Sequence, residues 1–190
     1  MEQNGAKMTK TQEFVPTPIQ VGALDAITKT KANKGILVMP TGTGKTFTAA
    51  LWFRGQLKKN PKSKLLFICH SNDILSQAQE KEFKRTLAQF HIEYSYFNAS
   101  GKVLSQATFA TVQTLATQLS KIPVDEFTHI IVDEAHHYQA KSFKKVILHF
   151  KPKFMLALTA TPNRMDNKQI TELFGEILYQ SNISDAIEKN

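Results

Sequence analysis

The sequence has very little cysteine and no long apolar run. Its single cysteine, Cys69, excludes a disulfide framework within the chain and favours a reducing compartment, so we expect a cytoplasmic protein. No apolar run approaches the roughly 20 residues of a membrane-spanning helix, and Met1–Lys10 has no signal-peptide core. We therefore expect no membrane partner. Cys69 follows Phe67 and Ile68, which predicts a buried strand position and a core role instead of a nucleophile.

Composition favours one globular domain with a polyanionic partner. Hydrophobic residues make up 42% of the 190 residues, enough for a buried core. The net charge is +8, and residues 164–190 hold three basic against five acidic residues, so the preceding residues carry +10. A basic body indicates nucleic acid first, although ordinary solvated lysines would give the same count.

An eight-residue stretch has the pattern of a phosphate-binding loop. Positions 39–46 read Met-Pro-Thr-Gly-Thr-Gly-Lys-Thr against the pattern G-x-x-x-x-G-K-[ST], with Met39 at the first glycine position. The residues before it predict a short buried strand and those after it a helix, whose N-terminus would lie beneath bound phosphates. A turn that merely joins strand and helix is the alternative. The expected contacts are Pro40, Thr41, Gly42, Thr43, Gly44, Lys45 and Thr46.

The residue types in this loop suit phosphate chemistry. Gly42 and Gly44 let the backbone turn so that its N–H groups face phosphate oxygens. Lys45 can reach the β- and γ-phosphates of a nucleotide, and the Thr46 hydroxyl can ligate Mg²⁺.

A second motif, Asp-Glu-Ala-His, follows the β-branched stretch 129–132. Asp133 would emerge at the carboxyl end of a strand, where open parallel sheets place their ligands. It can hold the same metal, while Glu134 orients an attacking water. A helix N-cap with an acidic first turn is the alternative, and the phosphate loop upstream favours the metal.

Apolar strands and helices alternate along the chain, which predicts a parallel sheet with helices on both faces. We expect a flexible segment at 1–14 and one domain at 15–190 that ends before a second lobe, or else at a natural frayed terminus. The expected strands are 35–39, 64–69, 94–97, 108–112, 129–132, 154–158 and 177–180. The expected helices are 17–32, 46–53, 72–90, 114–120, 141–150, 170–174 and a beginning at 183–188.

Three further segments complete an ordered set of motifs. They are Pro-Thr-Pro-Ile-Gln at 16–20, Ala-Thr-Val-Gln-Thr-Leu at 110–115 and Leu-Ala-Leu-Thr-Ala-Thr-Pro at 156–162. With the two motifs above, this order resembles the first RecA-like lobe of superfamily 2 helicases and translocases. It is most similar to the DEAH-type branch that includes type III restriction subunits. The resemblance implies an α/β RecA-like P-loop NTPase lobe, a mostly parallel central sheet and hydrolysis of Mg-ATP.

The resemblance also implies roles for single residues. Asp133 would hold magnesium, Glu134 would be the catalytic base, and Lys45 would bind phosphate. Gln20 would read the adenine edge, whereas an adenine-stacking aromatic is not clearly placed and Phe14 is only a candidate. The nucleotide site would be coupled to a second lobe through His136, Thr159 and Thr161.

Nucleic-acid contacts are implied at two strand-to-helix turns. Hydroxyl and amide groups there suit phosphate contacts and carry no base information. Simple helix capping, or for Thr111 a strand position, is the alternative. The implied track is DNA in preference to RNA. The residues are Ser71 and Asn72 in one turn, and Thr111, Gln113 and Thr114 in the other.

Two functions remain open. The first is the ATPase lobe of a nucleic-acid helicase or translocase, weakly active or inactive alone because a second RecA-like lobe supplies arginine fingers. The second is a nucleotide-switched nucleic-acid clamp or scaffold without processive movement. Glu134 argues against an inactive scaffold, which has no need of a catalytic base.

Overall fold

A computed structural model of the chain describes residues 15–137, 139–160 and 167–182. The predicted flexible segment 1–14, Thr161 and the expected helix beginning at 183–188 lie outside these residues. Within the described part, no helix is both long and apolar enough to cross a membrane.

A seven-stranded sheet forms the middle layer, in the order β3-β4-β2-β5-β6-β1-β7. Every pairing between these strands is parallel, which confirms the predicted α/β fold class. Parallel neighbours need crossover connections, and helices on both faces supply most of them, whereas residues 98–106 join β3 to β4 without a helix. The strands are β1 Lys34–Val38, β2 Leu65–Cys69, β3 Tyr94–Phe97, β4 Ala107–Thr111, β5 His129–Val132, β6 Phe154–Thr159 and β7 Ile177–Gln180.

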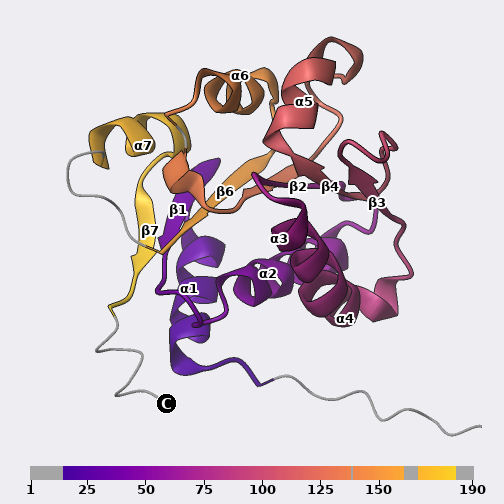
Figure 1. Ribbon diagram of the computed structural model, residues 1–190. Helices are drawn as coiled ribbons and strands as arrows, with labels where there is room; N and C mark the ends of the chain where they lie inside the picture. The colour runs from indigo at the N-terminus through magenta and orange to yellow at the C-terminus, as the bar shows by residue number, and fades with distance from the viewer. Residues whose placement is uncertain (1–14, 138, 161–166, 183–190) are drawn as a thin grey trace, which may run out of the picture.

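Helices cover the two faces in two groups (Figure 1). Alternate residues of β1 point into separate cores, Ile36 toward one group and Leu37 toward the other. One face carries α1 Pro18–Lys29, α2 Lys45–Lys59, α3 Asn72–Gln77, the π-helical turn η1 Ala78–Phe83, α4 Lys84–Leu87 and the 3-10 turn η2 Ala88–Phe90. The other face carries α5 Val112–Gln118, the 3-10 turn η3 Leu119–Lys121, α6 Lys141–His149 and α7 Asn167–Phe174, while η4 Ala135–His137 follows β5.

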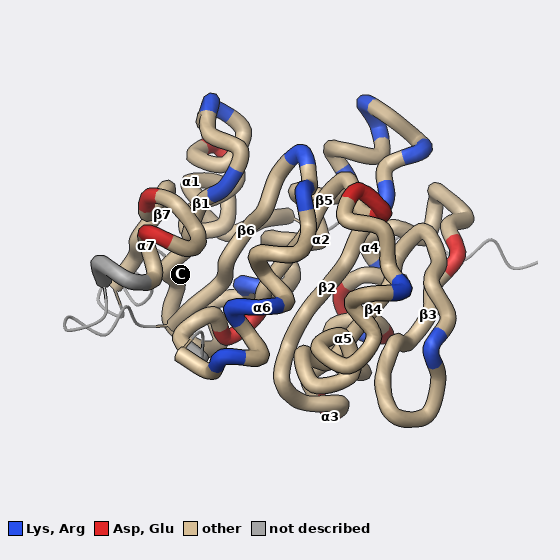
Figure 2. The backbone as a smooth tube through the Cα atoms, turned by 90° about the horizontal axis from the view of Figure 1, so that it is seen from above, with Lys and Arg blue, Asp and Glu red and all other residues tan. Residues whose placement is uncertain are grey.

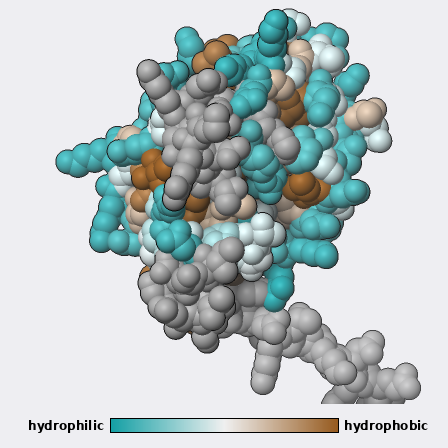
Figure 3. Space-filling view, turned by 60° about the vertical axis from the view of Figure 1, so that its left-hand side comes forward, coloured by the Kyte–Doolittle hydropathy of each residue, from teal (hydrophilic) through white to brown (hydrophobic). Residues whose placement is uncertain are grey.

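Aromatic side chains fill both cores. Phe67, Phe83 and Phe109 contact one another beneath α3 and η1, with ring centroids 5.3–5.6 Å apart. On the outer surface, Figure 3 shows apolar side chains as separate small patches among hydrophilic ones. The apolar area that is buried in the two cores is the main source of stability.

The sequence predicted one regular helix at 72–90, and this prediction is wrong. The segment is a succession of α, π, α and 3-10 turns that ends where His91 adopts a left-handed φ of 50°. Its buried positions are Leu75, Ala78, Gln79, Phe83, Thr86 and Leu87. This spacing of three and four residues also suits a regular α-helix, so the apolar pattern did not reveal the π turn.

Other boundaries differ by a few residues because of capping. α1 ends at Lys29, three residues before the predicted end. β4 ends at Thr111, which caps α5, so this helix begins at Val112 instead of residue 114. These shifts leave the order and type of the elements as predicted.

Candidate active site

The predicted phosphate loop and acidic motif meet at the carboxyl edge of the sheet. The loop follows β1 and the acidic motif follows β5, with β6 between them. The Met39 N–H donates to the Thr159 carbonyl at 3.0 Å, and the Asp133 N–H donates to the Ile68 carbonyl at 2.8 Å. These bonds continue the sheet by one residue past β1 and β5, so both motifs start from a rigid edge.

The loop has the left-handed turns that its glycines predicted. Gly42 has φ 85° and Gly44 has φ 82°. The Thr43 hydroxyl donates to the Pro40 carbonyl at 2.7 Å, and the Lys45 ammonium lies 3.5 Å from the same oxygen. Gly44 is also the N-cap of α2, so the N-terminal N–H groups of a 15-residue helix lie beside the loop.

Met39, at the first glycine position of the pattern, is fully buried in the core beside α2. A glycine is needed where backbone must turn or approach a ligand closely, and Met39 instead still extends the sheet. The departure from the sequence pattern therefore leaves the turn at Gly42 and Gly44 intact.

Gln20 links the first helix to the phosphate loop. Its side-chain oxygen accepts from the Thr17 N–H at 3.0 Å, in the capping box of α1. Its amide nitrogen donates to the Thr43 carbonyl at 3.0 Å. A Cβ added at Gly44 would lie 2.5 Å from the same nitrogen. Gln20 thus supports the loop, and its contact with an adenine remains a prediction.

Asp133 and Thr46 place two oxygen ligands side by side. Asp133 is 5% exposed, and the Thr46 side chain is hydrogen-bonded to it. Burial raises the pKa of the Asp133 carboxyl to about 6, and the Glu134 charge adds to this, against the opposing effects of the Glu134 N–H, Lys45 and Thr46. A carboxylate and a hydroxyl are hard donors, the ligand type that Mg²⁺ prefers. The residues present therefore fit the expected metal.

Glu134 has a backbone conformation that is uncommon for a residue with a side chain. Its φ is 51°, and its N–H donates to the Asp133 carboxylate at 2.9 Å. One Glu134 oxygen lies 3.1 Å from His136 Nδ1, which in turn lies 3.5 Å from the Thr159 hydroxyl. The structure thus brings together three residues predicted to act in catalysis and coupling. The left-handed turn at a non-glycine residue has an energetic cost that is typical of functional sites.

A cleft of about 390 Å³ lies between the loop and a second wall that sequence reasoning missed. The loop side includes Thr41, Gly42, Gly44, Lys45, Thr46, Phe47, Asp133 and Glu134. The second wall comes from α3 and η1 and includes Ile74, Gln77, Ala78, Lys81 and Glu82. The only signal in the sequence was a spacing of three or four residues between these positions, which places them on one helical face.

The predicted nucleic-acid contacts also lie at the carboxyl edge, over β2 and β4. Cys69 and Thr111 are register partners, so the two turns are neighbours. Ser71 accepts from the Asp73 N–H at 3.2 Å, and Thr111 accepts from the Thr114 N–H at 3.4 Å. These are helix caps, the alternative that the sequence left open.

Two other residues of this group differ in their surroundings. The Asn72 side chain accepts from the Asn98 amide at 3.0 Å, whereas Gln113 is exposed. A phosphate contact at these turns stays a prediction.

Cys69 is a core residue, as predicted. It is fully buried, and burial raises the pKa of its thiol to about 12. A thiol that stays protonated at neutral pH is no nucleophile.

Comparison with known proteins agrees with this arrangement. Residues 13–164 match the family model of the type III restriction enzyme, res subunit. The chain is 27% identical over 172 residues to a type I restriction enzyme EcoAI endonuclease subunit of Escherichia coli, covering 82% of this chain and 20% of that protein. It is 26% identical over 166 residues to the DNA 3'-5' translocase XPB2 of Sulfurisphaera tokodaii, covering 84% of this chain and 34% of that protein.

Solved structures show the same fold. The crystal structure of a hypothetical ATP-dependent RNA helicase from Sulfolobus tokodaii has a TM-score of 0.74 at 16% identity, covering 92% of this chain and 55% of that one. The chain spans a fifth to a third of the length of the two curated relatives described in the preceding paragraph.

Proposed function

Because this chain belongs to the family of the type III restriction enzyme res subunit, we propose that it is the first RecA-like lobe of a nucleic-acid-dependent ATPase. The proposed activity is the hydrolysis of Mg-ATP, coupled to movement on a polynucleotide or to its remodelling. The observation that carries the proposal is one cleft lined by Lys45, Thr46, Asp133 and Glu134.

Each of these four side chains has a role that its surroundings support. Lys45, 8% exposed at the N-terminus of α2, binds the β- and γ-phosphates. Glu134 orients the attacking water and accepts its proton, and its contact with His136 fixes the carboxylate. Thr46 and Asp133 would hold Mg²⁺, which neutralises charge on the phosphate oxygens when bound.

We propose DNA as the track, with RNA as the alternative. The net charge of +8 and the hydroxyl-rich turns at Ser71 and Thr111 support a polyanionic partner. One curated relative is named a DNA translocase, and one structural neighbour is named an RNA helicase. Contacts at these turns would bind the phosphate backbone and be independent of base sequence.

We further propose that residues 15–190 act together with a second RecA-like lobe. The His136–Thr159 pair adjoins the nucleotide site through the contact of His136 with Glu134, and it would transmit nucleotide state to that lobe, together with Thr161. An arginine finger from a partner can contribute a factor of roughly 10³–10⁵ in rate. The chain alone should therefore hydrolyse ATP slowly or not at all. Its single, buried cysteine supports a cytoplasmic location.

Steady-state ATP hydrolysis by a protein that carries this lobe and a second lobe tests the proposal. The assay is run without nucleic acid and with single-stranded DNA, duplex DNA or RNA. The chain alone and Lys45→Ala serve as controls. Stimulation by one polymer, absent in both controls, is expected and identifies the track. Hydrolysis that no polymer stimulates would favour a nucleotide-switched clamp or scaffold, and vigorous hydrolysis by the chain alone would contradict the need for a second lobe.

A further inference from the structure

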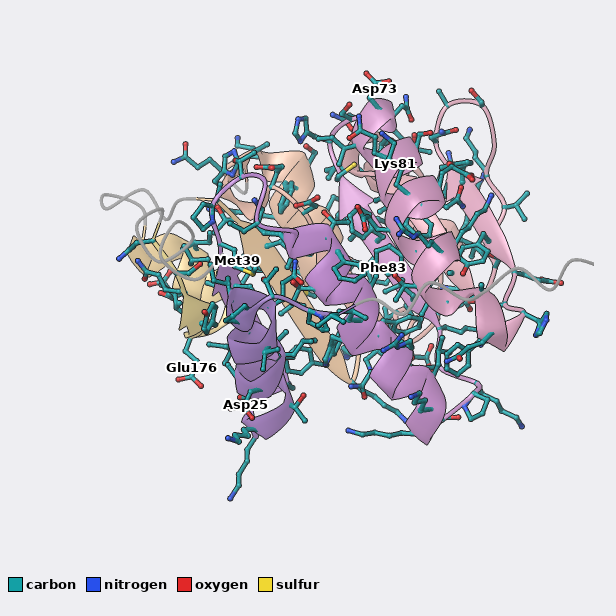
Figure 4. The ribbon with its side chains drawn as sticks, turned by 90° about the horizontal axis from the view of Figure 1, so that it is seen from below. Asp25, Met39, Asp73, Lys81, Phe83 and Glu176 are labelled. Atoms are coloured by element: carbon teal, nitrogen blue, oxygen red, sulfur yellow. The ribbon has the colours of Figure 1, made fainter. Side chains whose placement is uncertain are left out.

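The second wall of the nucleotide cleft has no role in the function proposed so far. It consists of one face of a continuous helical segment, α3 followed by η1, and it lies opposite the residues assigned to the metal and the attacking water. Figure 4 shows Lys81 on this segment, between Asp73 near its start and Phe83 at its end.

The π-helical turn determines which side chains face the cleft. Phe83, the last residue of this turn, is buried in the core. Two consecutive polar residues of the same turn, Lys81 and Glu82, line the cleft. π-helical turns within α-helices are frequent at functional sites, which makes this wall more than a packing surface.

Among the described residues that line this wall, Lys81 is the one cation, and its charge is not used elsewhere. Lys84, one turn further on, pairs with Glu80 at 2.6 Å. Within the described part of the chain Lys81 makes no ion pair. Its neighbour Glu82 is half-buried, and burial raises the pKa of that carboxyl while Arg85 and then Lys81 oppose the shift. The wall thus presents an unpaired ammonium beside a carboxyl group whose charge burial disfavours.

We propose that Lys81 is a further nucleotide-contacting residue, a second cation that binds the terminal phosphate of ATP opposite Lys45. The inference rests on the proposed ATPase function. It follows from the place of Lys81 in the wall of the same cleft as Thr46, Asp133 and Glu134, which are the groups assigned to the metal and the hydrolytic water. An ammonium in that position interacts with the charge that ATP has and ADP lacks.

Calorimetric binding of a non-hydrolysable ATP analogue and of ADP, each with Mg²⁺, tests this role. In the chain, Lys81→Ala should weaken binding of the analogue about tenfold and of ADP less than twofold. Lys81→Arg should restore most of the affinity, since it keeps the charge. Lys84→Ala removes a lysine of α4 that directly follows this segment and does not line the cleft, and this variant should bind both nucleotides as the unmodified chain does.

The outcomes separate this inference from the proposed function. Equal affinities for Lys81→Ala and Lys84→Ala, in a chain whose binding is lost in Lys45→Ala, would overturn the role of Lys81 and leave the ATPase site standing. An equal loss for the analogue and ADP would make Lys81 merely structural, as would a lower melting temperature of Lys81→Ala without nucleotide. An unmodified chain that binds no nucleotide would remove both proposals.

Discussion

The two edges of the sheet differ in where they place charge. At the carboxyl edge, Lys45 and Asp133 are buried, and they are the two formally charged side chains buried among the described residues. At the opposite edge, lysines lie in the last turns of helices and in the loops that lead into the strands, as Figure 2 shows at the side away from the start of α3. These exposed lysines are Lys29, Lys31, Lys58, Lys59, Lys62, Lys64, Lys151 and Lys153.

Left-handed backbone also serves different purposes at the two edges. His91 and Gly175 lie where helices end and strands begin, and there the conformation terminates a helix. Gly42, Gly44 and Glu134 follow strands and end no helix. The buried charges and the left-handed backbone of Glu134 cost stability without ending an element, so function is the better explanation for them.

Substitutions at the two edges should differ most in their effect on the rate of ATP hydrolysis. In a two-lobe protein, Glu134→Gln should lower the rate constant of ATP hydrolysis by about 10²- to 10⁴-fold, because it removes the proton acceptor. ATP binding should change less than twofold. Glu126→Gln, at the amino edge, is the matched control and should hydrolyse ATP normally. Unchanged turnover in Glu134→Gln would show that another group is the base.

Acid should destabilise the chain through a histidine at the amino edge. Burial, with a smaller effect of Lys153, lowers the pKa of His129 from 6.5 to about 4. The unfolded chain therefore takes up a proton at higher pH than the folded chain does. This contribution to stability is complete above pH 6.5 and is lost as the pH falls toward 4. At about 1.4 kcal/mol for each tenfold change in proton affinity, the loss is about 3 kcal/mol.

Urea unfolding at a series of pH values measures this effect. The slope of unfolding free energy against pH between 6.5 and 4 should be smaller in His129→Gln than in the unmodified chain. His149→Gln is the control, since this ring at the end of α6 is only partly buried and its Nε2–H donates to the Ile122 carbonyl at 2.8 Å. Equal slopes in all three proteins would refute the assigned cause.

Alanine substitutions at two glycines distinguish a left-handed turn that serves nucleotide binding from one that ends a helix. Gly44 and Gly175 have φ of 82° and 84°, so alanine at either should cost about 1–3 kcal/mol of stability. The added Cβ would meet Gln20 at 2.5 Å in the first case and the Lys34 carbonyl at 2.8 Å in the second. Only Gly44→Ala should weaken ATP binding, measured by calorimetry, because it displaces the phosphate loop. Weaker ATP binding in Gly175→Ala would contradict the distinction between a turn that serves binding and a turn that ends a helix.

The sequence predicted the order of strands and helices because those signals are local. The apolar strand before Asp133 and the Gly-x-Gly-Lys-Thr turn before α2 are short patterns that fix both element and end. A parallel sheet then brings the carboxyl ends of its strands together, which is why the sequence alone was enough to assign Lys45 and Asp133 to one site.

Other features depend on tertiary contacts that a single sequence does not encode. A glutamate does not by its residue type predict the φ of 51° that Glu134 adopts. The π-helical turn had no distinct signal in the sequence, because the apolar spacing of Phe83 and Leu87 also suits an ordinary helix. The position of Lys81 depends on the pairing of β2 with β5, which places the helix after β2 against the site.

The smallest expected effect concerns an ion pair at the amino edge. Lys64 and Glu126 lie 2.8 Å apart with side chains 45% and 21% exposed. Because solvent screens such pairs, Lys64→Ala should lower the unfolding free energy by no more than about 1 kcal/mol, and less at high salt. Nucleotide affinity should not change. Urea unfolding of the two single variants and the double variant isolates the coupling between the charges. A coupling well above 1 kcal/mol would mean that the amino edge, too, holds charge in a poorly solvated setting, and the contrast between the edges would then be one of degree.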